Sequence, residues 1–300
     1  MTDILISIII PVYNGSRHIL ETLESVKKQT YSNWEIVIVN DCSIDDTVEI
    51  VNQFAQGVSN SIKLITNKKN LGVSVSRNTA VSNCTGKWLA LLDSDDIWLP
   101  NHLETLVNQV EKDTEISVVY AGCKVFLDDI NNIVHKQAID KVMLDNFKIS
   151  LYAHEIGINS STSFIKKDAW GNCGGMIQGL NFGEEMELFI RLARNNKKFK
   201  FSEYYTVLYR KHSNFGAASN NSVKMALGNL YIYEKHFDWE VIPFKIRKNQ
   251  LSNAHLSYAR LVRHLNIKKA TQHALKALKV KKNLKNVVYF SLFSLLSIKL

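Results

Sequence analysis

Four apolar runs alternate with stretches of helical character through the first hundred residues, and this alternation leaves few possible architectures. The first run, ILISIIIPVYN, is almost continuously apolar and rich in isoleucine, as expected of a strand buried on both faces. Further runs lie at residues 35–40, 62–66 and 87–92, and helices are expected between them at 16–29, 45–55 and 73–82. The pattern predicts an α/β fold, with a mostly parallel, Rossmann-like sheet and helices on both of its faces.

Polar side chains follow each of the four predicted strands. They are Tyr13 with Asn14, then Asp41, then the segments 67–70 and 93–96. Ligands of a parallel sheet bind at the carboxyl ends of its strands. The sequence therefore predicts that these groups meet at one edge of the sheet and form a nucleotide pocket.

The acidic run Asp93-Ser94-Asp95-Asp96 directly follows the last of these buried strands. Three carboxylates in four residues repel one another unless a cation joins them. Oxygen ligands in a DxD arrangement suit Mg²⁺ or Mn²⁺ that bridges a diphosphate. A solvated turn that caps the following helix is the alternative interpretation.

Two longer stretches place this run in a wider pattern. They are SIIIPVYNGSRHILETLESVKKQTYSNWEIVIVNDCSIDDT and NLGVSVSRNTAVSNCTGKWLALLDSDD. Together they resemble the family 2 glycosyltransferases, and the resemblance extends from Ser7 to His212. It implies the GT-A fold and an inverting transfer of the kind that builds bacterial surface polysaccharides. The chain departs from the family pattern at Asn40, where an acid is usual, and at Cys42, where glycine is frequent.

The resemblance assigns a nucleotide-sugar site and a metal site. Asp41 matches the acid that accepts the uracil N3–H, and Arg77 matches an arginine near the diphosphate and base. Asp95 is the expected direct ligand of Mn²⁺ or Mg²⁺, with Asp93 and His212 as further ligands. A hydrogen bond to phosphate and an isolated surface histidine are the alternatives for His212. The implied nucleotide-sugar site comprises Pro11, Tyr13, Asn14, Asp41, Arg77, Asp93, Ser94 and Arg210.

The segment that begins at Gly183 resembles the Glu-Asp motif of the family, whose second acid is the general base. Glu185 occupies that position here, and Glu184 is the second candidate. A carboxylate can do this work if it lies within hydrogen-bond reach of the acceptor hydroxyl. Glu187 remains a further option, and an acid-rich helix N-terminus is the structural interpretation of the same residues.

The pattern of the chain changes after about residue 115, where strands and turns follow one another, and after residue 220, where only helices are predicted. We therefore predict a GT-A catalytic domain at 1–220, made of a nucleotide-binding half (1–112) and an acceptor half (113–220). A helical, basic C-terminal region is predicted at 221–300.

The net charge of +9 is concentrated at the C-terminal end. Residues 241–300 hold thirteen Lys and Arg and no Asp or Glu, whereas the other 240 residues hold 24 basic and 28 acidic side chains. This distribution implies an anionic partner for the tail, and its apolar end at 287–300 indicates an anionic membrane surface. A helix packed on the catalytic domain is the alternative. Nucleic acid is not expected as a partner.

The four cysteines are widely spaced and form no CxxC pair, and the N-terminus carries an acid where a secretory signal has basic residues. These features predict a cytoplasmic protein with reduced thiols, peripheral on the inner face of the cytoplasmic membrane.

The expected activity is that of a metal-dependent, inverting hexosyltransferase. It would move a sugar from a nucleoside-diphosphate sugar, with UDP favoured, to a hydroxyl of a glycan or lipid-linked glycan. A nucleotidyltransferase is an alternative, but it needs a basic phosphate-binding loop where PVYNGSRH offers only Arg17. A non-catalytic module that binds a sugar or a protein partner is another, and assembly into a homo-oligomer stays open.

Overall fold

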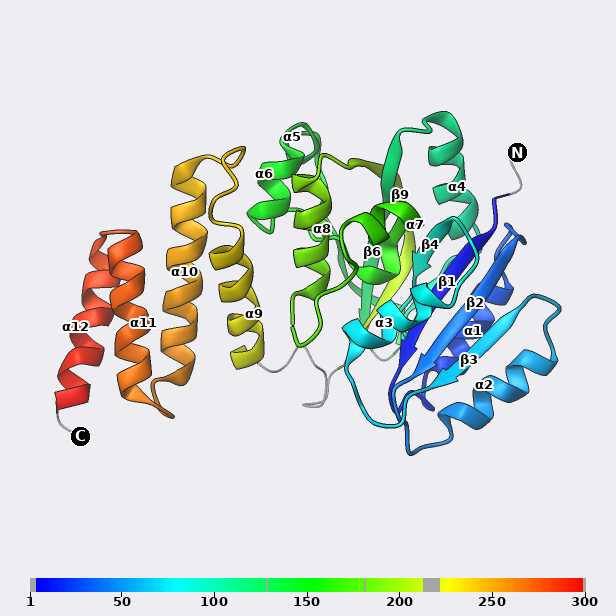
Figure 1. The fold of residues 1–300 in the computed structure, drawn as a ribbon, viewed down its shortest axis with the longest axis horizontal. Coiled ribbons are helices and arrows are strands. Elements are labelled where there is room, and N and C mark those ends of the chain that lie inside the picture. The colour runs from blue at the N-terminus through cyan, green and yellow to red at the C-terminus, as the bar shows by residue number, and fades with distance from the viewer. Residues whose placement is uncertain (1–3, 128, 181, 213–221, 299–300) are drawn as a thin grey trace. The chain divides into compact units, whose positions relative to one another are not determined.

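The apolar runs form neighbouring strands of one large sheet. The computed structural model describes residues 4–127, 129–180, 182–212 and 222–298. Within them the sheet has nine strands in the order β3-β2-β1-β4-β8-β6-β9-β5, and β7 pairs with β6 outside this path (Figure 1). The strands of the first hundred residues are β1 (Ile6–Val12), β2 (Trp34–Asn40), β3 (Ile62–Thr66), β4 (Trp88–Leu91) and β5 (Ile97–Trp98).

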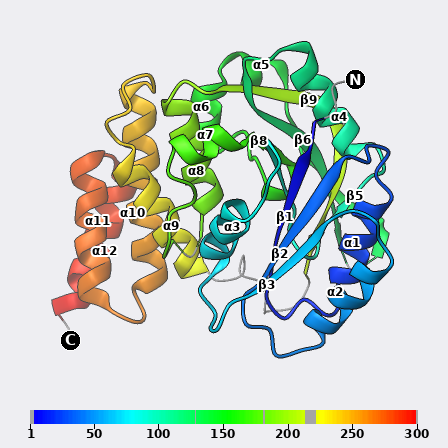
Figure 2. The same cartoon turned by 45° about the vertical axis from the view of Figure 1, so that its right-hand side comes forward.

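The strands β3, β2, β1 and β4 are parallel to one another. The chain moves outward from β1 to β3 and then returns to β4. Right-handed crossovers place the helix of the return connection on the face opposite the two helices of the outward connections. Figure 2 shows α1 and α2 on one side of these strands and α3 on the other. The helices are α1 (Ile19–Lys27), α2 (Thr47–Gln56), α3 (Val73–Ser82) and α4 (His102–Lys112).

Because both faces are covered, every residue of β1, β2 and β4 is buried, which explains the unbroken apolar pattern of these runs. The predicted α/β architecture is confirmed. The strand order reverses between β1 and β4, and in open α/β sheets the ligand site lies outside the carboxyl ends of the strands at such a point.

Strands from the second half of the chain extend the sheet beyond β4. β8 is antiparallel to β4, and β6 is parallel to β9, whose far end is paired with β5. The strands are β6 (Ile116–Leu127), β7 (Asp129–Lys136), β8 (Ser163–Lys166) and β9 (Lys198–Lys211). The helical segments are α5 (Lys141–Asp145), α6 (Phe147–Tyr152), the 3₁₀ turn Ser160–Thr162, α7 (Lys167–Asn172) and α8 (Glu184–Arg194).

The chain forms two compact units, and each draws on several stretches of sequence. The first contains the whole sheet and lies within residues 1–144, 157–179 and 188–213. The second lies within residues 145–156, 180–187 and 214–300, so the boundary between the units falls inside α8. The domain limits at residues 112 and 220 stay a prediction.

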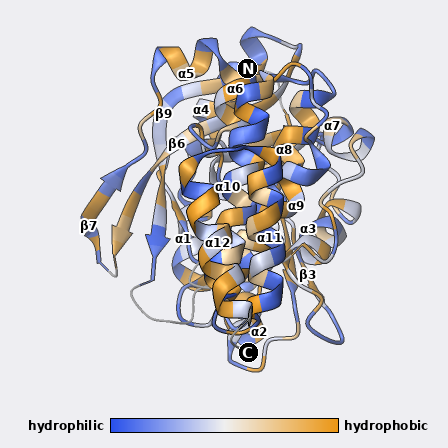
Figure 3. Cartoon of the chain, turned by 90° about the vertical axis from the view of Figure 1, so that its left-hand side faces the viewer, coloured by the Kyte–Doolittle hydropathy of each residue, from blue (hydrophilic) through white to orange (hydrophobic). Residues whose placement is uncertain are grey.

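Four helices follow one another in the second unit, as predicted for the C-terminal region, and each packs on the next. Asn266 is the N-cap residue of α11, and its side chain accepts a hydrogen bond from the Lys269 backbone N–H. Figure 3 shows hydrophobic residues along the length of α10, α11 and α12. Among the described residues no helix combines the length and the apolar character needed to cross a membrane. The helices are α9 (Ser222–Lys235), α10 (Phe244–Val262), α11 (Ile267–Val280) and α12 (Leu284–Ile298).

A buried carboxylate, that of Glu35 on β2, joins the ends of the central strands that lie away from the predicted pocket. One of its oxygens accepts hydrogen bonds from the Ser7 hydroxyl at 2.7 Å and from the backbone N–H groups of Thr85 and Gly86 at 2.5 and 3.0 Å. Burial alone raises the pKa of Glu35, but these hydrogen bonds outweigh it and hold the pKa below its ordinary value.

A carboxylate whose pKa is lower in the folded than in the unfolded protein stabilises the fold at pH values above its unfolded pKa. This contribution is lost as the pH falls through the folded pKa. Glu35→Gln keeps an acceptor oxygen but removes the charge, so we expect the free energy of unfolding to fall by about 1 kcal/mol at neutral pH. The difference from the parent protein should shrink in acid. Urea denaturation from neutral to acidic pH measures both effects. Glu49→Gln, on the exposed face of α2, is the control and should leave stability unchanged.

Candidate functional site

The acidic loop after β4, residues 93–96, lies at the point where the strand order reverses. Asp93 begins it, and its backbone N–H donates a hydrogen bond of 3.0 Å to the Ser161 hydroxyl. Its carboxylate lies 2.5 Å from the guanidinium of Arg77, which is almost fully buried on α3. The structure therefore brings together two of the predicted residues, Arg77 and Asp93, and directs a buried positive charge at the acidic loop.

Asp95 and His212 form the second contact between predicted residues. Asp95 Oδ2 and His212 Nε2 lie 2.7 Å apart, although the two residues are separated by 117 positions in the chain. Burial raises the pKa of Asp95, repulsion from Asp93 raises it further, and the contact with His212 opposes both. A second imidazole, that of His18, lies with its ring centroid 5.4 Å from that of His212. Sequence reasoning missed His18, because the resemblance gave it no role although it ends the segment PVYNGSRH.

The donor set of this loop fits a divalent cation in its chemistry. Asp93 and Asp95 offer carboxylate oxygens, and His212 offers a ring nitrogen beside them, all of which Mg²⁺ or Mn²⁺ accept. The mutual repulsion that raises the pKa of Asp95 is the repulsion that a bound cation relieves. In the described part of the chain, no group of three or more His, Cys, Asp or Glu side chains stands ready to hold an ion. The metal ligands therefore stay a prediction.

Asp96 is the last residue of the acidic loop, is fully buried and holds the loop in place. Its carboxylate accepts a hydrogen bond of 2.5 Å from the Ser161 hydroxyl and one of 2.9 Å from the Arg210 backbone N–H. Burial and the neighbouring carboxylates of Asp95 and Asp93 raise its pKa well above the ordinary value. The third acid of the run thus has a structural role, which the sequence did not distinguish from that of its neighbours.

The Arg210 side chain lies beneath the same loop. Its Nε donates a hydrogen bond of 2.9 Å to the Asp95 carbonyl, and its Nη2 forms an ion pair with Glu21 of α1. The guanidinium also lies over the Phe126 ring, 4.5 Å from the centroid. These contacts hold Arg210 in place under Asp95, and its role as a donor ligand stays a prediction.

The Glu21–Arg210 pair provides a test of how the loop is held. Glu21→Ala leaves the buried guanidinium of Arg210 without its carboxylate, and we expect a loss of about 1–3 kcal/mol in the free energy of unfolding. Urea denaturation measures it. Glu24→Ala removes the same charge from the same helix without breaking that ion pair and is the matched control. Equal losses in the two variants would show that the pair does not secure the loop.

Asp41 follows β2 and is buried at the same edge. It accepts three hydrogen bonds, from Asn67 Nδ2 at 2.8 Å and from the backbone N–H groups of Leu71 and Gly72 at 2.9 and 2.7 Å. The carboxylate thereby fixes the loop that leads into α3, where Gly72 has a φ of 87° that favours glycine. An ionised carboxylate has about four acceptor positions, so capacity for one further donor, such as a base N–H, remains.

The remaining predicted donor residues surround the loop after β1. Pro11 is buried within β1, and Tyr13 is exposed beside it. Asn14 adopts a left-handed conformation, with its side-chain oxygen accepting a hydrogen bond from the Ile44 backbone N–H. A Cβ placed on Gly15 would lie 3.6 Å from Ser94 Oγ, which brings this loop against the acidic loop. The structure therefore gathers all the predicted donor residues at one sheet edge.

The predicted general bases lie in the first turn of α8, within the second unit. Glu184 and Glu185 are both half-buried. Glu187 is fully buried, with its carboxylate 2.7 Å from Lys235 Nζ and 3.3 Å from His236 Nε2. These contacts give Glu187 a structural role within its unit. The assignment of Glu185 as the base, with Glu184 as the alternative, stays a prediction.

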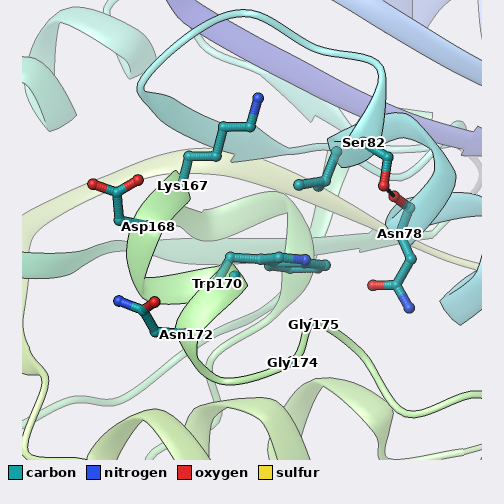
Figure 4. Close-up of a pocket in the computed structure, with 10 residues that line it drawn as sticks. Asn78, Ser82, Lys167, Asp168, Trp170, Asn172, Gly174 and Gly175 are labelled. Atoms are coloured by element: carbon teal, nitrogen blue, oxygen red, sulfur yellow. Dashed lines mark hydrogen bonds between the residues drawn. The ribbon is translucent and has the colours of Figure 1, made fainter.

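A shallow pocket of about 560 Å³ lies between α3 and α7 (Figure 4). Asn78, which lines this pocket, binds the backbone of Met176: it donates a hydrogen bond to the carbonyl at 2.7 Å and accepts one from the N–H at 2.9 Å. Gly175 has a φ of 68° and packs so closely on Asn78 that a Cβ would lie 2.6 Å from its amide oxygen. The residues that line this pocket include none of the acidic loop, so it is separate from the predicted donor site.

Residues 7–180 match the family described as Glycosyl transferase family 2. The UDP-Glc:alpha-D-GlcNAc-diphosphoundecaprenol beta-1,3-glucosyltransferase WfgD of Escherichia coli is 40% identical over 136 residues, which are 45% of this chain and 51% of that protein. The chain thus spans about half the length of the curated relatives that it matches first.

Solved structures show the same fold. S. aureus TarS 1-349 in complex with UDP-GlcNAc has a TM-score of 0.65 at 17% identity. The match covers 95% of this chain and 78% of the TarS chain. The mannosyltransferase PcManGT from Pyrobaculum calidifontis, in complex with GDP-Man and Mn²⁺, has a TM-score of 0.62 at 16% identity over 98% and 80% of the two chains. The GT-A architecture predicted from the sequence is confirmed.

Proposed function

The chain belongs to glycosyl transferase family 2, and from this premise we propose that it transfers a sugar from a nucleoside-diphosphate sugar to an acceptor hydroxyl. The observation that carries the proposal is the pairing of Arg77 with Asp93 and of Asp95 with His212 at the point where the strand order reverses. Charged groups of both signs converge there at the strand ends, as a diphosphate and its counter-ion require.

The donor would bind along this edge, with its base near Asp41 and its diphosphate near Arg77 and the acidic loop. The guanidinium of Arg77 is fixed by burial, so it would meet the diphosphate without a large loss of side-chain freedom. Asp93, Asp95 and His212 would hold Mn²⁺ or Mg²⁺, which when bound neutralises charge on the departing nucleoside diphosphate. Asp96 and Arg210 would keep the loop that carries these ligands in position.

The acceptor hydroxyl would lose its proton to Glu185, and the oxygen would attack the anomeric carbon from the face opposite the nucleoside diphosphate. This displacement inverts the configuration of that carbon. The first turn of α8 suits an acid that must remain ionised, because the helix N-terminus carries a partial positive charge. Glu184 is the alternative base in the same turn.

Support for the donor and acceptor classes comes from the related proteins. The name of WfgD specifies UDP-Glc and a GlcNAc-diphosphoundecaprenol acceptor, and TarS was solved with UDP-GlcNAc. PcManGT was solved with GDP-Man and Mn²⁺. We therefore favour a UDP-sugar as donor, a glycan or lipid-linked glycan as acceptor, and the cytoplasmic side of a membrane as the place of action.

The metal and the donor should bind together. We expect Mn²⁺ and UDP jointly to raise the melting temperature of the parent protein and to have no joint effect on Asp95→Ala. Differential scanning fluorimetry measures this, and circular dichroism checks that the variant is folded. Asp129→Ala removes an exposed carboxylate from β7 and should respond like the parent. An undiminished response of Asp95→Ala would exclude this residue from the metal site.

Catalysis should separate from donor binding at α8. We expect Glu185→Gln to lower turnover by about a hundredfold or more, in line with the loss of a general base, while the affinity for the donor stays nearly unchanged. Release of UDP from UDP-sugars in the presence of candidate acceptors measures turnover, and titration with UDP measures binding. Glu184→Gln is the matched variant. If it proves inactive and Glu185→Gln active, the base is Glu184.

A further inference from the structure

The last helix of the second unit has two apolar sides. One side packs on α11 and includes Phe293, which is 1% exposed. On the rest of the helix six large apolar residues are exposed, and at 100° per residue they spread over about half of its circumference, centred roughly opposite Phe293. We call these residues the α12 stripe. They are Leu284, Val287, Val288, Leu292, Leu295 and Leu296.

The contacts of Asn286 fix which side of α12 faces outward. Its side chain is 2% exposed and donates hydrogen bonds to Ser252 Oγ of α10 at 2.8 Å and to the Lys281 carbonyl at 2.7 Å. Asn283 begins the helix and accepts a hydrogen bond from the Asn286 backbone N–H. Because a buried amide without partners is costly, α12 cannot rotate to bury the stripe without losing these bonds.

The charge around the stripe has one sign. Lys282 and Lys285 are exposed beside its first turn, and Lys276 and Lys279 are exposed on the neighbouring α11. The sequence from residue 241 to residue 300 contains no Asp or Glu. An apolar helix face flanked by lysines and free of carboxylates matches the surface of an anionic bilayer, where the apolar side chains enter the acyl boundary and the ammonium groups contact phosphate.

We propose that the α12 stripe is a membrane-docking surface, which lies flat on a bilayer that contains anionic phospholipid. The stripe runs along the helix axis, so the helix axis lies in the plane of the bilayer. A second copy of the chain is a poorer occupant, because it would bring two lysine-rich surfaces of the same sign together. The docking surface is independent of the donor chemistry and places the enzyme where a lipid-linked acceptor lies.

Co-sedimentation of the full chain with phosphatidylcholine vesicles, with and without phosphatidylglycerol, tests this surface. We expect binding only to vesicles with phosphatidylglycerol, and a decrease in binding as NaCl screens the charges. The double variant Leu292→Ser, Leu295→Ser should bind these vesicles at least about tenfold more weakly, because two exposed apolar side chains no longer enter the bilayer. Lys282→Gln with Lys285→Gln should weaken binding and reduce its dependence on salt.

Leu227→Ser is the matched control, because Leu227 is exposed to a similar extent on α9 of the same unit, away from the stripe. It should bind vesicles like the parent, and circular dichroism should show all variants folded. Equal binding to both kinds of vesicle would overturn the proposal, as would unchanged binding of the Leu292, Leu295 variant. A concentration-dependent dimer that this variant abolishes, in a protein that binds no vesicles, would instead assign the stripe to contacts between copies.

Discussion

The geometry of the acidic loop depends on one fully buried residue, Asp96. Its carboxylate accepts hydrogen bonds from Ser161 and from the Arg210 backbone, and its carbonyl accepts one from the Thr22 hydroxyl. Helix α1, the 3₁₀ turn and β9 are thereby joined to the end of β4. Each buried polar group left without a partner would cost roughly 1–3 kcal/mol, so this network has few alternative arrangements. Asp93 and Asp95 are held on its open side.

The sheet topology supplies the partners of these two acids from distant parts of the chain. Arg77 lies on α3, the helix that connects β3 to β4. Only a short stretch of chain therefore separates it from its partner Asp93. His212 follows β9, a strand that reaches the loop only because it pairs with β6 and β5 along the far half of the sheet. The candidate site therefore joins a local arrangement of α/β units with a long-range one.

The local arrangement was largely predictable and the long-range one was not. Apolar runs and helical spacing located β3 and α3 at the bounds that the structure shows, and polar residues at strand ends indicated the binding edge. The same reasoning could not separate Asp96 from Asp93 and Asp95, because only burial in the folded chain distinguishes these three acids of one four-residue run. It also could not pair Glu21 with Arg210, since the order of strands in the second half has no signature in the sequence. The resemblance to a family supplied the candidate base, which no periodicity indicates.

Two neighbouring residues of α3, Arg77 and Asn78, both contact Met176, and this has a consequence for how such chains can diversify. Arg77 contacts Asp93, while Asn78 holds the backbone of Met176 on both sides. The chain that continues from Met176 towards Glu184 therefore starts from a fixed point. Insertions and deletions in that stretch would change the chain only after Met176. They would leave the contact between Arg77 and Asp93 undisturbed. Evolution, or an engineer, can thus vary the length of this loop while the donor-side pair is inherited intact.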